Sequence, residues 1–391
     1  MKLSIDFGII ILVLCLFFAA FATYYSPSLN SIGLYVAIPL ASLLTFQKFR
    51  FNNVNKSVKL LIWMYVWNAI TYIWAVDSNA ASTELHSDFG AVLVCYIFAM
   101  NAKKEKLIPW LYMAYVILYM SAWNYARTHI LVDMGELGAQ NERLNDERLN
   151  ANTMAYYTFY VSFAFYIMGE IIKEHRMKQL MKYLFIAMIP ISFVVAILTA
   201  SRQVLVIQVP LMSVLLYLRY VQYATNTRKF LFLFIAVVTL FCVYNDVMEI
   251  YSNSYLSTRS QDSAKDDIRR FLMEDALQVG FSNFFTGVGA GCYCTVSKYG
   301  LFSHSTYFEL FANTGILGVS LFMSSLWCFL KTQLKRFRQT KDNRFLVFLF
   351  FGVMFVFDNF FFVFHFSVWL MGIFTLVASQ SDSIYKSEYQ N

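Results

Sequence analysis

His304 is the residue of this sequence best placed to act as a general base. It lies between two serines in LFSHSTYFELFANTGILG, residues 301–318, just before an aromatic and apolar run. Thr306 and Glu309 have the T-x-x-E spacing of a capping box, which predicts that a helix begins near Thr306. A helix N-terminus disfavours a charged imidazolium, so His304 should stay neutral and able to accept a proton. The alternative interpretation is a histidine that merely lies at the membrane interface among polar loop residues.

Two adjacent arginines belong to a predicted amphipathic helix at about 264–279, with Ser263 as its capping residue. Four apolar residues share one face of this helix at helical spacing: Ile268, Leu272, Ala276 and Val279. Arg269 borders that face, about 100° around the helix from its first residue. Arg270 points away from the face, toward Glu274 at i+4, as in an ordinary exposed pair. We therefore prefer Arg269 to Arg270 as a ligand for an anion.

A third arginine, Arg202, lies between two apolar segments in LTASRQVLV, residues 198–206. An arginine at or inside a membrane is costly and usually marks a function or an anion partner. The alternative is a side chain that extends to the lipid headgroups at a helix end. Arginine binds phosphate oxygens bidentately and stays protonated, so these arginines and a neutral base would suit a diphosphate leaving group and a hydroxyl nucleophile.

The glycine-rich stretch TGVGAGCY, residues 286–293, could cradle phosphate through the backbone N–H groups around Gly287 and Gly289. It lacks the GxxxxGK[ST] form, so a tight turn is the favoured interpretation. Cys292 and Cys294 indicate neither a disulfide with each other nor a metal site, and no metal or cofactor is expected. Five other ionisable residues are looser candidates for a functional role: Asp77, Glu84, Asp88, Asp358 and His365.

The elements that carry these residues must cross a membrane. Of the 391 residues, 59% are hydrophobic and only 14% charged, and the mean hydropathy is +0.52. Soluble domains contain about half apolar and a quarter charged residues, so a single water-soluble core is excluded. With about 20 residues per span, the sequence predicts an all-α polytopic membrane protein with about twelve spans. They lie at 5–24, 30–47, 59–76, 88–101, 107–126, 151–172, 181–200, 203–219, 229–245, 306–330, 342–358 and 361–379.

Lysine and arginine concentrate in every second predicted loop, which is the pattern of the positive-inside rule. The basic loops are 47–59, 101–107, 172–182, 219–229 and 331–344. The rule places both termini of a single membrane domain, 1–391, in the cytoplasm, and it explains the basic excess without nucleic acid. The long loops 127–150 and 246–305 are then extracytoplasmic. We therefore expect Arg202, Arg269 and His304 on the extracytoplasmic side of a plasma membrane.

Four stretches resemble motifs of the bacterial O-antigen polymerase and O-antigen ligase superfamily of integral membrane proteins. They occur in the expected order: LNANTMAYY (149–157), LTASRQ (198–203), IRRFLMEDAL…FFTGVGAGCY (268–293) and HSTYFELFANTGILG (304–318). The last resembles the family's His-x-x-Tyr-x-x-x-x-x-x-x-Gly-x-x-Gly signature. Ser305 departs from the asparagine that the family often has directly after the histidine.

The resemblance implies a metal-independent, inverting glycosyltransferase, in which Arg202 and Arg269 bind the diphosphate of an undecaprenyl-diphosphate-linked donor. His304 would deprotonate the acceptor sugar hydroxyl, which attacks the anomeric carbon of the donor. The motifs imply supporting positions at Asn152, Arg270, Gly287, Gly289 and Tyr307. The implied partners are the lipid-linked donor and acceptor and the bilayer, with a chain-length regulator and a flippase as further candidates.

Three functions are compatible with this reading. A polymerase of surface polysaccharide is favoured because the superfamily holds many divergent polymerases. A ligase, which moves finished glycan onto a lipid A-core acceptor, would use the same motifs. A glycolipid flippase or other transporter is the alternative of a different class, but transporters place polar residues near the bilayer midplane, whereas the suggestive residues here cluster in an outer loop.

Overall fold

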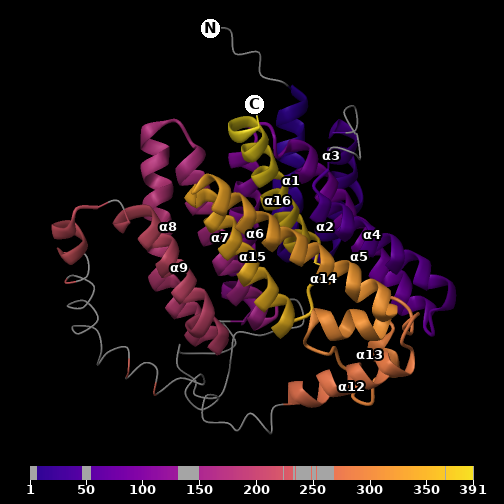
Figure 1. Ribbon diagram of the computed structural model, residues 1–391. Coiled ribbons are helices and arrows are strands. Elements are labelled where there is room, and N and C mark those ends of the chain that lie inside the picture. Colours follow the sequence, from indigo (N-terminus) through magenta and orange to yellow (C-terminus); the bar gives the residue numbers. More distant parts are fainter. Residues whose placement is uncertain are drawn as a thin grey trace. The chain divides into compact units, whose positions relative to one another are not determined.

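The computed structural model describes residues 7–45, 54–130, 149–222, 224–231, 234, 248, 252, 268–365 and 367–390. The secondary structure of these residues is helical, without a strand (Figure 1). The chain divides into two compact units, which are described separately: unit 1 is Met1–Ala114 with Ala264–Asn391, and unit 2 is Tyr115–Ser263.

Unit 1 contains most of the helices. In chain order they are α1 (Phe7–Tyr25), α2 (Pro27–Ile32), η1 (Gly33–Ala37), α3 (Ile38–Thr45), α4 (Lys56–Thr71), η4 (Tyr72–Trp74), α5 (Ser78–Asn101), α12 (Ile268–Ser282), α13 (Tyr293–Val296), α14 (Thr306–Thr340), α15 (Asn343–Phe361) and α16 (Val368–Tyr389). The boundary at Ala114 falls within α6 (Ile108–Tyr125). Unit 2 continues with η5 (Ala126–Ile130), α7 (Ala151–Ile171), α8 (His175–Thr199), η6 (Val204–Gln208), α9 (Val209–Leu216) and η7 (Tyr217–Val221).

Among the described residues, six helical segments are long and apolar enough to cross a membrane. They are Phe7–Tyr25, Pro27–Thr45, His175–Thr199, Val204–Val221, Thr306–Thr340 and Asn343–Phe361. The described part of the protein is thus all-α with several membrane-compatible helices, as the sequence predicts. Helices also occupy the other predicted spans, except for 229–245, most of which lies outside the described residues. Twelve spans remain a prediction.

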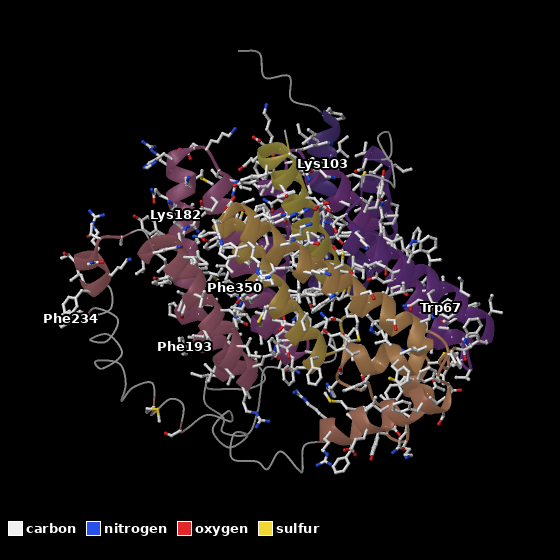
Figure 2. The ribbon with its side chains drawn as sticks, viewed as in Figure 1. Trp67, Lys103, Lys182, Phe193, Phe234 and Phe350 are labelled. Atoms are coloured by element: carbon white, nitrogen blue, oxygen red, sulfur yellow. The ribbon has the colours of Figure 1, made fainter. Side chains whose placement is uncertain are left out.

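Helix α14 is the central packing element of unit 1, because it contacts α4, α12 and α15. Trp67 of α4 lies where α4 packs against α14 (Figure 2). Its indole N–H donates to the carbonyl of Thr314 at 2.8 Å. That carbonyl is open to a partner because the backbone at Gly315 leaves the helical conformation, with φ 67° and ψ −168°. The predicted span 306–330 is therefore a helix broken after its first turns.

Two connections that the sequence predicts to be extracytoplasmic meet at one end of unit 1: the α4–α5 connection and the glycine-rich turn. The Val76 N–H donates to the carbonyl of Val288 at 3.1 Å, which joins the α4–α5 connection to the glycine-rich turn. The Ala290 N–H donates to the hydroxyl of Thr71 at 3.0 Å. The turn after α5 that carries Lys103 lies at the opposite end of that helix, beyond its 24 residues (Figure 2). Lys103 is thus separated from these two connections by the length of α5.

Candidate functional site

His304 occupies a left-handed turn directly before α14. Its φ is 58°, which non-glycine residues adopt rarely, and its side chain is half-buried. Ser303 and Ser305 on either side are buried. The helix begins at Thr306, as the sequence predicts, so the imidazole stands at a helix N-terminus.

The predicted capping box is wrong in its partners. Ser305 is the N-cap residue, and its side chain makes no capping bond. The Glu309 carboxylate instead accepts from the Ser303 N–H at 2.7 Å, so it closes the turn that contains His304. The Thr306 hydroxyl instead donates to Asn359 Oδ1 at 2.8 Å, because the last turn of α15 offers it a tertiary partner.

The loop after α15, through its described residues 362–365, supports the His304 turn from the other side. The Thr306 N–H donates to the Phe362 carbonyl at 3.0 Å, and the Phe364 N–H donates to the Thr306 hydroxyl at 2.8 Å. The ring centroids of His304 and Phe362 lie 5.8 Å apart. Three backbone or side-chain contacts therefore hold the turn in one conformation.

Helix α12 presents the two arginines differently. Arg270 is exposed and forms the expected i+4 ion pair with Glu274, with 2.8 Å between Nε and Oε1. Arg269 is half-buried. Leu272 and Ala276 are buried on the predicted apolar face, but Ile268 is 53% exposed, so it is not part of the packed face. The predicted start of this helix, before Ile268, lies outside the described residues.

The glycine-rich turn packs against the break in α14. The N–H groups of Val288 and Gly289 donate to the carbonyls of Ala312 and Asn313 at 3.0 and 2.8 Å. Gly287 and Gly289 have φ of +64° and +105°, and a Cβ on Gly287 would collide with the backbone of Asn313. These N–H groups are occupied by protein carbonyls, which explains the glycines as a tight turn.

An apolar groove of about 580 Å³ lies between α12, α14 and α15. Its lining side chains are aliphatic and aromatic, and their polar groups are the indole N–H of Trp327 and the hydroxyl of Tyr307, which donates to the carbonyl of Val356 at 3.1 Å. Tyr307 follows His304 by three residues. Leu277 and Phe281 bring α12, the helix of Arg269, to the same groove.

Arg202 and Asn152 belong to unit 2, where their segments are joined. Tyr156 of α7 donates its hydroxyl to Gln203, the residue after Arg202, at 2.7 Å. Arg202 is half-buried and follows Ala200, which ends α8 in a left-handed conformation with φ 49°. Asn152 is 2% exposed in the first turn of α7.

The sequence matches no protein-family model, and no curated protein matches it. The functional argument therefore depends on the chemistry of the residues themselves. Within the described part of the chain, no three His, Cys, Asp or Glu side chains are grouped to hold a metal ion. Burial raises the pKa of the Cys294 thiol to about 12, so this cysteine is not a ready nucleophile at neutral pH.

A buried histidine and acid pair is the feature that the motifs do not include. The Nε2 atom of His365 lies 2.6 Å from Oε1 of Glu84, and both side chains are almost fully enclosed. From the sequence, both residues are only minor candidates for a functional role. Their position as ionisable residues in or beside long apolar runs could have ranked them higher, because burying such groups in a membrane costs free energy.

Proposed function

We propose that this protein is a surface-polysaccharide polymerase, a metal-independent inverting glycosyltransferase that joins undecaprenyl-diphosphate-linked repeat units outside the plasma membrane. The observation that carries the proposal is the arrangement around the start of α14. A rigid turn presents His304, and an apolar groove begins three residues later at Tyr307. The helix that carries Arg269 lines the same groove.

His304 acts in this proposal as the general base. It takes the proton of an acceptor sugar hydroxyl, whose oxygen attacks the anomeric carbon of the donor. The bond between that carbon and the diphosphate oxygen breaks, and the electron pair leaves with the diphosphate. Its position before a helix N-terminus favours the neutral imidazole that this step requires. Attack opposite to the leaving group inverts the configuration.

Arg269 binds the diphosphate and stabilises the charge that develops on it. Guanidinium groups suit this role because they offer several donors to phosphate oxygens and remain protonated. Arg269 is half-buried, in contrast to Arg270, which is exposed and already paired with Glu274. The role of Arg202 rests on its motif alone.

The groove accommodates the polyprenyl chain of the donor. Such a chain has no polar groups, and the groove lining has almost none. Burial of a lipid chain contributes about 0.8 kcal/mol per CH₂ group. An apolar groove lined by α14 shortly after His304 and by the helix that carries Arg269 matches a molecule that is lipid at one end and a sugar diphosphate at the other.

Deletion of the protein in its parent cell, followed by glycan profiling, tests this proposal. We expect a surface lipid that carries one repeat unit in place of a polymer ladder, and restoration of the ladder by a plasmid copy. Polymer retained on the polyprenyl carrier would show that the protein is a ligase and not a polymerase. An unaltered glycan would contradict both enzyme functions and favour the transporter.

Arg269→Ala should lower polymer formation by about 10–100-fold, the effect of losing a hydrogen-bond donor to a charged group. The matched control is Arg270→Ala, one residue away on the same helix, which removes only an exposed ion pair and should leave polymer near wild type. Quantified glycan ladders at equal protein levels compare the two. A larger loss in Arg270→Ala would show that the arginine assignment is reversed.

A further inference from the structure

His365 is anchored in unit 1 through both its side chain and its backbone. Its Nε2 atom lies 2.6 Å from Oε1 of Glu84 on α5, where the two side chains are 2% and 11% exposed. The hydroxyl of Tyr65 on α4 donates to the His365 carbonyl at 2.8 Å. Two helices thus hold this residue, which lies in the loop between α15 and α16.

Carboxyl groups from two helices lie near the imidazole of His365. Glu84 and Asp88 come from α5 and Glu309 from α14. Of these, the Glu84 carboxylate is the one that contacts Nε2.

The loop that His365 anchors is the one on which the His304 turn rests. Phe362 accepts the Thr306 N–H and lies with its ring against that of His304. Phe364, directly before His365, donates to the Thr306 hydroxyl at 2.8 Å. A continuous series of contacts therefore leads from Glu84 on α5, through His365 and the residues just before it, to Thr306 and the His304 turn.

We infer that the His365–Glu84 pair is a positioning device that holds residues 362–365, and through Thr306 the turn that directs His304. A buried pair adds little net stability, because desolvation offsets its attraction, but loss of one partner leaves the other unsatisfied. Its value here is one fixed loop conformation. The expected loss of activity when the pair is broken rests on the proposed function. The expected change in the conformation of the turn does not.

Three variants test the pair: His365→Gln, Glu84→Gln and the double variant, which retains an uncharged hydrogen-bonding pair. Each single variant should lower polymer formation by up to about 100-fold, as small misplacements of a catalytic group do. The double variant should lose less thermal stability than the two single variants together, because it leaves no unpaired charge. His86→Gln is the matched control, since His86 is exposed on α5 two residues from Glu84. It should behave as wild type.

The position of His304 is read out independently of activity by its rate of modification with diethylpyrocarbonate in membranes, followed by mass spectrometry. We expect this rate to change in both single variants, while modification of the exposed His175 stays constant. An unchanged rate at His304, or additive stability losses in the double variant, would overturn the inference. If His304→Ala left polymer normal, the proposed function would fail, yet the modification rates would still decide whether the pair positions the turn.

Discussion

His304→Ala should remove polymer from the cell surface while the protein remains in the membrane. Loss of a general base lowers the rate by about 10²–10⁴-fold, which would leave no visible ladder. The side chain is half-buried, and the turn is held by backbone contacts and by its neighbours, so the fold should persist. Glycan gels and immunoblots of membranes from a deletion strain carrying the variant measure the two effects together.

His304→Asn separates the base from the backbone strain of this position. Asparagine tolerates the left-handed conformation that residue 304 adopts, but it cannot accept the proton. It should therefore be as inactive as the alanine variant and at least as stable. His175→Ala is the matched control, because His175 is an exposed histidine at the N-terminus of another helix, α8. Normal ladders from either His304 variant would defeat the assignment of the base.

The features that depend on neighbours in the sequence were predictable. The start of α14 at Thr306 and the Arg270–Glu274 pair are both confirmed. Each follows from the geometry of one or two helical turns, in which residues three and four apart meet. The more buried position of Arg269 follows from the same geometry.

The contacts that define the site are between segments far apart in the chain, and a single sequence carries no signal for them. Thr306 has the spacing of a capping residue, yet its hydroxyl finds Asn359 and the loop after α15. His365 and Glu84 meet only because α5 and α16 pack together. The local sequence pattern predicts that a buried hydroxyl, imidazole or carboxyl group needs a hydrogen-bond partner. The packing of the helices determines which partner it contacts.

The break in α14 shows the same limit within one segment. FANTGILG reads as the apolar continuation of a span, and composition predicts one uninterrupted helix. Gly315 instead leaves the helix so that the glycine-rich turn can approach, and a Cβ at this position would collide with the Phe285 carbonyl. A glycine in a helical pattern allows a break, but only the opposing backbone requires it.

Gly287→Ala should destabilise the protein strongly, because this glycine meets two requirements at once. Its φ of +64° is unfavourable for alanine, and a Cβ would enter the backbone of Asn313 at the break in α14. The conformational term costs about 1–2 kcal/mol, and overpacking costs about 1–3 kcal/mol more. We expect a loss of unfolding free energy of about 2–5 kcal/mol, seen as a lower thermal midpoint in detergent and less protein in the membrane.

Gly300→Ala tests the conformational requirement alone. Gly300 has nearly the same φ, +63°, but no atom lies within 4 Å of the position its Cβ would take. This variant should lose only the conformational term of about 1–2 kcal/mol, so the difference between the two variants measures the collision. Equal losses of unfolding free energy in the two variants would mean that the glycine-rich turn is not closely packed against the break in α14. Wild-type stability of Gly287→Ala combined with loss of polymer would instead favour a direct role of the turn in binding phosphate, because only ligand contact would then explain the glycine.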